Sequence, residues 1–204
     1  MGLLEGKVAI VTGAGGGLGR AHALLLAEHG ACVVVNDLGG ARDGTGSSNS
    51  MADSVVEEIR NAGGQAAATY GSVTEDDAAK AMVQCAVDNF GRLDILINNA
   101  GILRDRSFKN MTDAEWDAVI EVHLRGAYLV TKHSWQQMLT QGDGGRIIMT
   151  SSTSGLIGNF GQANYGAAKA GLAGFMRVLA LEGIKYGITV NVLCLLYTSD
   201  AADE

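Results

Sequence analysis

Three side chains in the last third of the sequence have the types and spacing needed for proton transfer. Tyr165 and Lys169 stand four residues apart, which places a phenol and an ammonium on the same face of a helix. Ser152 precedes the tyrosine by thirteen residues. Removing a hydroxyl proton from an alcohol requires a base, and a tyrosine with a pKa of about 10 is a poor base at neutral pH. Because nearby positive charge lowers that pKa, we predict that Tyr165 is the acid–base group, Lys169 its electrostatic partner and Ser152 the donor that orients the substrate oxygen.

A glycine cluster near the start of the chain has the pattern of a dinucleotide-binding turn. Glycines 13, 17 and 19 stand in the spacing Gly-x-x-x-Gly-x-Gly, directly after an apolar run. Glycines let a diphosphate approach bare backbone, and the N-terminus of the following helix supplies N–H donors. Asp37 lies where the second strand is expected to end, and a carboxylate there accepts ribose hydroxyls and repels a 2′-phosphate. We therefore expect NAD as the cofactor, with NADP less favoured because it would need Arg20 or Arg42 to hold the phosphate.

Alternating strands and helices must position these two groups of residues. Short β-branched runs predict strands at residues 8–11, 32–35, 66–70, 93–97, 145–150 and 188–193. Helical segments lie between them, at 18–29, 54–61, 75–90, 112–138 and 163–186. Ala21, Leu24 and Leu25 are expected on the buried side of the first helix, and Thr112 with Glu115 forms a predicted capping box. Apolar strands separated by helices imply a Rossmann-like, doubly wound α/β fold with a parallel sheet of six strands.

Composition narrows the classes of partner. The 204 residues suit one domain, and the net charge of −7 argues against nucleic acid, because phosphate binding needs a basic face. No apolar run approaches the ~20 residues of a membrane span, and no signal peptide is recognised, so we expect a cytoplasmic protein with no membrane partner. The three cysteines lack metal-ligand spacing and are expected to be reduced thiols, with no metal site.

The combination of motifs resembles the short-chain dehydrogenase/reductase family. The glycine spacing, the serine–tyrosine–lysine set and the run Asn98-Asn99-Ala100-Gly101 correspond to motifs of that family. The resemblance implies that Lys169 also holds the nicotinamide ribose and that Ser72 and Val73 border the adenine ring. The cofactor-binding set expected on these grounds comprises Gly13, Gly17, Leu18, Gly19, Asp37, Ser72, Val73, Asn99, Ala100 and Gly101, together with Tyr165 and Lys169.

One position departs from the usual family pattern. Members of the family commonly carry an asparagine in the long helix before the fifth strand, whereas this chain has His123 within Val-His-Leu-Arg-Gly. A histidine there has two possible roles: it holds the water that relays protons to Lys169, or it packs in the core. We favour the relay and keep packing as the alternative.

Further segments resemble one branch of the family. Residues 36–40, 101–108, 122–126 and 158–165 are similar to the (3R)-hydroxyacyl-CoA dehydrogenase domain of peroxisomal multifunctional enzymes and their bacterial relatives, and the similarity covers residues 4–192. The resemblance implies NAD-dependent oxidation of a (3R)-3-hydroxyacyl-CoA to the 3-ketoacyl-CoA, a homodimer or homotetramer, and a peroxisomal location if the source is eukaryotic. The residue chemistry alone supports only a secondary alcohol going to a ketone, so a steroid or another alcohol stays open as substrate.

The last eleven residues are predicted not to belong to the domain. Residues 194–204 read Cys-Leu-Leu-Tyr-Thr-Ser-Asp-Ala-Ala-Asp-Glu, which is similar to the translation of a transposase adapter used in sequencing libraries. We therefore expect a NAD-binding domain over residues 1–193 and a non-native, poorly packed tail over 194–204. By resemblance, a C-terminal lid, a helix and a seventh strand are then missing. The alternative function is a truncated, catalytically silent fragment that binds a dinucleotide.

Overall fold

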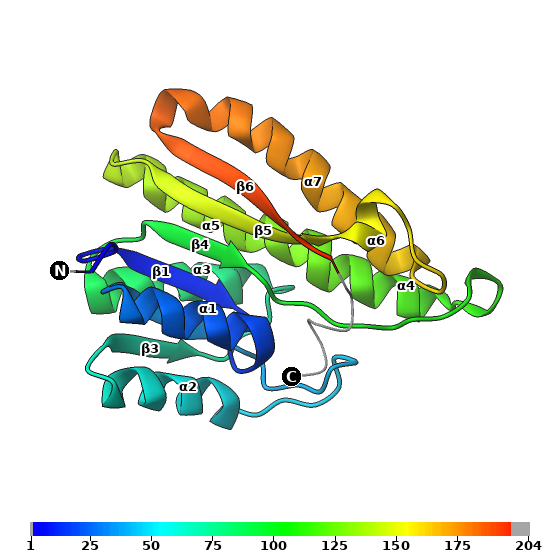
Figure 1. Cartoon of the computed structure of the whole chain (residues 1–204), viewed down its shortest axis with the longest axis horizontal. Coiled ribbons are helices and arrows are strands. Elements are labelled where there is room, and N and C mark those ends of the chain that lie inside the picture. The colour runs from blue at the N-terminus through cyan, green and yellow to red at the C-terminus, as the bar shows by residue number, and fades with distance from the viewer. Residues whose placement is uncertain (1, 197–204) are drawn as a thin grey trace.

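The structure, a computed structural model that describes residues 2–196, contains the predicted parallel sheet of six strands (Figure 1). The strand order is β3-β2-β1-β4-β5-β6. The runs of valine, isoleucine and alanine form the inner strands, which helices bury on both faces. The bounds are β1 Val8–Thr12, β2 Cys32–Asn36, β3 Gln65–Thr69, β4 Ile95–Asn98, β5 Gly145–Ser152 and β6 Ile188–Leu195.

Helices cover the two faces of the sheet in two separate apolar clusters. The helices α1 (Gly17–Glu28) and α2 (Ser50–Asn61) pack on one face, against alternate residues of β1 and β2 such as Val11 and Val33. The helices α3 (Asp76–Phe90), α5 (Gly126–Gln141) and α7 (Ala163–Gly183) pack on the other face, around Ile10 and Ile147. The inner strands β1, β2 and β4 are therefore buried on both faces, whereas the outermost strand β6 exposes Thr189, Asn191 and Leu193 on one side.

The first helix is rotated relative to the prediction. Ala21 and Leu25 are exposed, whereas Ala23 is buried and Leu24 packs against the core. The cause lies at Gly19, where any side chain would overlap the carbonyl of Gly13. This close approach fixes which side of the helix faces the sheet, and Ala23 lies one turn further along that side.

The predicted long helix at 112–138 is interrupted. It consists of α4 (Asp113–Ile120), a π-helical turn (Glu121–Arg125) and α5. The capping box of Thr112 and Glu115 at its start is confirmed. Wider π turns insert one extra residue and are often found at functional sites. Here the turn contains His123, whose ring lies directly against Gly101.

The sixth strand differs from the prediction at its end. β6 runs parallel to β5 and continues two residues beyond Leu193, so that Cys194 pairs with Ser151 and Leu195 pairs with Ser152. These first two residues of the predicted tail are therefore part of the sheet, because the ladder of backbone hydrogen bonds along β5 extends to Ser152. The rest of the tail from residue 197 onward lies outside the described residues.

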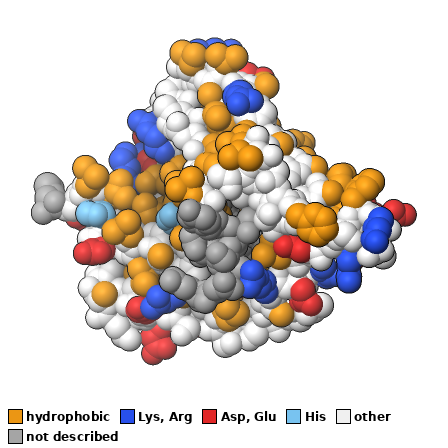
Figure 2. Space-filling view, turned by 45° about the vertical axis from the view of Figure 1, so that its right-hand side comes forward, with side chains coloured by type: hydrophobic (Ala, Val, Ile, Leu, Met, Phe, Trp, Pro, Cys, Tyr) orange, Lys and Arg blue, Asp and Glu red, His pale blue; other side chains and the backbone are white. Residues whose placement is uncertain are grey.

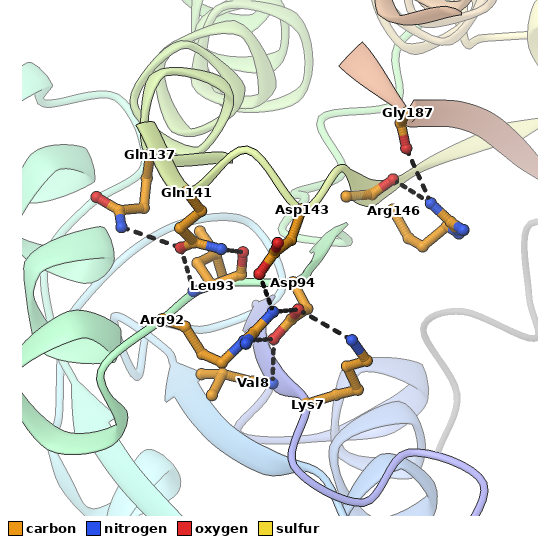
Figure 3. Close-up of polar contacts among 11 residues, drawn as sticks. Lys7, Val8, Arg92, Leu93, Asp94, Gln137, Gln141, Asp143, Arg146 and Gly187 are labelled. Carbon is orange, nitrogen blue, oxygen red and sulfur yellow. Dashed lines mark hydrogen bonds and ion pairs between the residues drawn. The ribbon is translucent and has the colours of Figure 1, made fainter. Parts of the chain in front are cut away.

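A polar network holds the amino ends of the central strands together (Figure 3). The carboxylate of Asp94 accepts two hydrogen bonds from Arg92, at 2.8 and 2.7 Å, one from the backbone N–H of Val8 at 3.0 Å and one from Lys7 at 3.4 Å. Gln141 at the end of α5 bonds both backbone groups of Leu93. These contacts fasten β1 to β4 at the edge opposite the predicted chemistry, so the carboxyl edge is free to carry a site.

Candidate active site

A cleft of about 600 Å³ opens at the carboxyl ends of the strands. Its walls come from the β1–α1 turn, the end of β2, the loops after β3 and β4, the π turn and the start of α7. Ligands of open parallel sheets bind at this edge, where the strand order reverses. Most predicted residues line the cleft: Gly13, Gly17, Leu18, Asp37, Ser72, Val73, Asn99, Ala100, Gly101, His123, Tyr165 and Lys169.

The glycine turn forms the floor of the cleft beneath the N-terminus of α1. Gly13 and Gly17 have φ values of 63° and 48°, in the left-handed region that favours glycine. Gly19 does not line the cleft; it lies behind the turn, against the Gly13 carbonyl. The glycines leave the backbone of the turn bare, and the first N–H groups of a helix such as α1, which have no acceptor within the helix, favour an anion such as a diphosphate. These observations fit a dinucleotide cofactor.

Asp37 fastens two loops at the rim of this cleft. Its Oδ2 accepts a hydrogen bond from the N–H of Gly15 at 2.7 Å, and its Oδ1 accepts one from the N–H of Gly39 at 2.6 Å. Each carboxylate oxygen retains lone-pair capacity for a ribose hydroxyl. Of the two arginines considered for a phosphate, Arg20 is engaged with Glu58 at 2.6 Å and does not line the cleft, whereas Arg42 does line it. The carboxylate thus has a structural role that its position in the sequence did not show.

The Asn-Asn-Ala-Gly run supports the glycine turn from below. The Asn99 amide donates to the carbonyls of Thr12 and Gly13, both at 3.1 Å. In return, the Thr12 hydroxyl accepts from the N–H groups of Asn99 and Ala100 at 3.0 and 3.1 Å. Thr12 was not among the predicted site residues. A polar residue at the carboxyl end of a buried strand is the signal that could have identified Thr12. Thr150, near the carboxyl end of β5, is a second buried threonine that this signal would have identified.

Tyr165 and Lys169 lie together on the first turns of α7, as their spacing predicts. The ammonium is 5.3 Å from the centre of the tyrosine ring, and both side chains are buried. Lys169 donates to the Thr150 carbonyl at 2.6 Å, and burial lowers the pKa of its ammonium to about 7. Burial also raises the pKa of Tyr165, although a hydrogen bond from Ser152 acts in the opposite direction. The lowering of this pKa expected from the sequence is therefore not found in the protein alone, because the loss of solvent outweighs the favourable contacts.

Ser152 occupies the junction between β5 and a short helix, α6 (Thr153–Leu156). It is fully buried, ends the strand and caps the helix by accepting the N–H of Ser154 at 3.2 Å. It does not line the cleft, but its hydroxyl reaches Tyr165, and Leu195, its partner in β6, is part of the cleft wall. The structure therefore brings all three predicted catalytic residues together.

His123 is buried beside Tyr165 and Lys169. Its ring meets the Tyr165 ring edge-on at 5.1 Å, and its Nε2 lies 3.0 Å from the backbone N of Ile102 and 2.8 Å from the backbone O. Burial first, and then the charge of Lys169, lower the pKa of His123 to about 3, so the ring is neutral. Its Nδ1 has no hydrogen-bond partner among the described residues. A small internal cavity of about 10 Å³ adjoins it, lined also by Thr12, Asn98 and Lys169.

Two further findings concern a membrane-spanning helix and a metal site. Within residues 2–196, no helix is long and apolar enough to cross a membrane. In the same part of the chain, no group of three or more histidine, cysteine, aspartate or glutamate side chains is arranged to hold a metal ion.

A dinucleotide-binding sheet with a tyrosine and a lysine facing its glycine turn defines an oxidoreductase that acts on a small molecule with a nicotinamide dinucleotide. A family model described as short chain dehydrogenase matches residues 7–203, and the chain belongs to this family. It is 55% identical over 93% of its length to the peroxisomal multifunctional enzyme type 2 of Mus musculus, and 46% identical over 94% to the hydroxyacyl-CoA dehydrogenase ChsB1 of Mycobacterium tuberculosis. A short chain dehydrogenase structure from Mycobacterium avium superposes with a TM-score of 0.87 at 50% identity, covering 95% of this chain.

This chain spans only part of these proteins. It covers 25% of the mouse enzyme, 61% of the Mycobacterium tuberculosis enzyme and 68% of the Mycobacterium avium chain. The comparisons confirm the predicted family and the oxidoreductase class.

Proposed function

We propose that this chain forms the catalytic domain of a NAD-dependent dehydrogenase that oxidises a secondary alcohol to a ketone, with a (3R)-3-hydroxyacyl-CoA as its substrate. The observation that carries the proposal is the buried Tyr165–Lys169 pair, which lines the same cleft as the glycine turn. Burying a lysine that is paired mainly with a backbone carbonyl is costly, and such perturbed groups in clefts are commonly functional.

Each side chain has a distinct task in this reaction. The phenolate form of Tyr165 accepts the hydroxyl proton of the alcohol, and the phenol form returns it in the reverse direction. Ser152 donates to the substrate oxygen, and the positive charge of Lys169, 5.3 Å from the tyrosine ring, favours the phenolate. When bound, NAD supplies the acceptor for the hydride. Lys169, together with the positive charge that an oxidised nicotinamide ring would supply, opposes the effect of burial on the pKa of Tyr165.

The preference for NAD over NADP is assigned to Asp37. Its carboxylate is held in place by two backbone N–H groups, so its negative charge cannot easily move away from a 2′-phosphate. A fixed carboxylate at the end of the second strand accepts the ribose hydroxyls of NAD and repels NADP.

His123 is assigned to the path by which Lys169 exchanges protons. The Nε2 of His123 lies within hydrogen-bonding distance of both the backbone N and the backbone O of Ile102, whereas its Nδ1 is buried and has no hydrogen-bond partner among the described residues. The adjoining cavity of about 10 Å³ approaches the size of one water molecule and is lined by polar groups, among them Thr12 and Lys169. A water there would connect the Nδ1 of His123 to the Lys169 ammonium.

The acyl-CoA substrate is supported by the surface around the cleft. The loops beside Ser152 and Tyr165 expose Phe108, Ile157 and Phe160, with exposed fractions of 77%, 85% and 89%. Figure 2, which turns the carboxyl edge of the sheet towards the viewer, shows several groups of hydrophobic side chains on this face. Exposed apolar surface of this kind suits an acyl chain. The Mycobacterium tuberculosis relative is named a hydroxyacyl-CoA dehydrogenase, which supports the same class of substrate.

The test measures NADH formation by the 204-residue chain with the (3R) and (3S) isomers of a 3-hydroxyacyl-CoA, and with a hydroxysteroid for comparison. We expect turnover with the (3R) isomer alone, and loss of it in the Tyr165→Phe variant. Equal rates with both isomers would refute the stereochemical assignment, and turnover of the steroid alone would refute the acyl-CoA. NAD binding by calorimetry without turnover of any substrate would instead identify a dinucleotide-binding fragment.

A further inference from the structure

A chain of hydrogen bonds leads away from Ser152 through residues that do not line the cofactor cleft. The Ser152 oxygen accepts from the backbone N–H of Ser154 at 3.2 Å, while the contact that its hydroxyl donates to the Ser154 hydroxyl is long, at 3.5 Å. The Ser154 hydroxyl donates to the side-chain oxygen of Gln162 at 2.7 Å. The amide nitrogen of Gln162 then donates to Asp105 at 2.8 Å. Ser152, Ser154 and Gln162 are each at most 6% exposed, whereas Asp105 is at the surface. The chain therefore connects the active-site serine to an exposed carboxylate.

The orientation of the Gln162 amide is determined by its neighbours. A carboxylate only accepts hydrogen bonds, so the NH₂ group must face Asp105 and the amide oxygen must face Ser154. The same oxygen accepts from Asn159 at 3.2 Å. The Ser154 hydroxyl is consequently a donor to Gln162, and its backbone N–H remains the donor to Ser152.

This chain of bonds joins three segments that surround the reacting groups. Asp105 belongs to the loop after β4, Ser154 to α6, and Gln162 is the N-cap of α7, one turn before Tyr165. A parallel bridge between Arg106 and Gln162 fastens the loop to α7 a second time. The position of Ser152 relative to Tyr165 thus depends on a junction that touches neither the cofactor cleft nor the substrate oxygen.

We propose that Gln162, anchored by Asp105, is a positioning residue that holds Ser154 and thereby keeps the Ser152 hydroxyl in hydrogen-bonding position at Tyr165. The proposal rests on the proposed roles of Ser152 and Tyr165. Replacing Gln162 with methionine keeps a similar length but removes its bonds to Ser154, Asn159 and Asp105, which frees Ser154 and loosens Ser152. We expect kcat to fall about tenfold, the equivalent of one neutral hydrogen bond, with the KM for NAD unchanged.

The proposal has a readout that needs no turnover, namely the titration of Tyr165. The groups that face this phenol are Lys169 on α7, His123 on the π turn, Asp105 on the loop after β4 and Cys194 on β6. The hydrogen bond from Ser152 lowers the Tyr165 pKa, whereas the charge of Asp105 raises it. Weakening the serine contact and removing the carboxylate charge therefore shift this pKa in opposite directions.

The experiment follows phenolate absorbance against pH in the full chain, with the Tyr165→Phe curve subtracted. Gln162→Met should raise the Tyr165 pKa, and Asp105→Asn, whose side-chain oxygen still accepts from Gln162, should lower it. Adding Gln162→Met to Ser152→Ala should produce no further rise, because the effect acts through that serine. An equal rise in both backgrounds, or none in Gln162→Met, would overturn the proposal.

Two controls separate positioning from general damage. Gln84→Met removes a similar glutamine–aspartate hydrogen bond, of 2.7 Å to Asp88, on the exposed surface of α3 and should change nothing at the site. Ser154→Ala removes the bond to Gln162 with a smaller change and should also raise the Tyr165 pKa. This second variant tests the positioning role even if Gln162→Met folds poorly. Lack of turnover in the unaltered chain would count against the proposed function only, because the titration decides the positioning role by itself.

Discussion

Replacing Lys169 with methionine should stabilise the folded protein while abolishing its turnover. Burial lowers the pKa of this lysine from 10.5 to about 7, which at about 1.4 kcal/mol per pKa unit is an unfavourable free energy of about 5 kcal/mol for the charged form. Methionine has a similar length and no charge. It leaves the Thr150 carbonyl without its donor, which costs about 1–3 kcal/mol. The net expectation below pH 7 is a gain of about 2–4 kcal/mol in the free energy of unfolding.

The gain in the free energy of unfolding from Lys169→Met should decrease as pH rises. Between about pH 7 and 10.5 the unfolded lysine keeps its proton, whereas the folded one has released it, so the unaltered protein becomes more stable as pH rises. The advantage of Lys169→Met should therefore be largest below pH 7 and vanish towards pH 10.5, where only the lost hydrogen bond remains.

Urea unfolding followed by circular dichroism, from below pH 7 to above pH 10, measures this difference. The matched control is Lys80→Met on the exposed side of α3, which should change the free energy of unfolding by no more than about 0.5 kcal/mol at any pH. A Lys169→Met variant that is less stable than the unaltered chain at neutral pH, or a difference independent of pH, would refute the reasoning from burial.

Three other substitutions test the remaining parts of the structure. Tyr165→Phe should reduce kcat by about 10³-fold with NAD affinity unchanged, as shown by initial rates and calorimetry; substantial residual activity would contradict its role as acid–base group. Asp37→Ala should weaken NAD binding, relax the exclusion of NADP and lower the Tm, because two backbone N–H groups lose their acceptor; an unchanged cofactor preference in competition binding would contradict the assignment. Asp94→Asn should destabilise the fold by about 3 kcal/mol. Burial acts to raise the pKa of Asp94, but the hydrogen bonds and ion pairs of the carboxylate lower it below its usual value. The contribution of Asp94 to the free energy of unfolding is therefore present above about pH 4 and lost in acid. Equal acid unfolding midpoints for the variant and the unaltered chain would refute this.

The features that the sequence predicts well depend on neighbours along the chain. The Tyr165–Lys169 pair follows from helical spacing. The glycine turn follows from the spacing of its glycines, of which Gly13 and Gly17 adopt the left-handed backbone that favours this residue. The capping box at Thr112 is equally local and is confirmed. Each of these needs only a few consecutive residues, so it can be recognised before any tertiary contact is known.

The features that the sequence does not predict depend on contacts between distant segments. The face of α1 is set by the meeting of Gly19 with the Gly13 carbonyl rather than by the helix's own apolar pattern, which pointed to Leu25. The π turn at His123, the burial of Lys169 and the connection from Gln162 to Asp105 likewise arise when separate elements pack together. Long-range packing overrides local preference at such places.

The central position of β1 has a consequence for how the chain forms its site during synthesis. β1 pairs with β2 almost as soon as both emerge, but its other neighbour is β4, and Ala9 meets Ile95 only after 86 further residues. At 5–20 residues per second, this corresponds to about 4–17 s in which one edge of β1 has no partner. Throughout that time, the glycine turn also lacks Asn99, which bonds the carbonyls of Thr12 and Gly13. The nascent chain thus carries an open, apolar strand edge, where mispairing competes with folding until β4 is made.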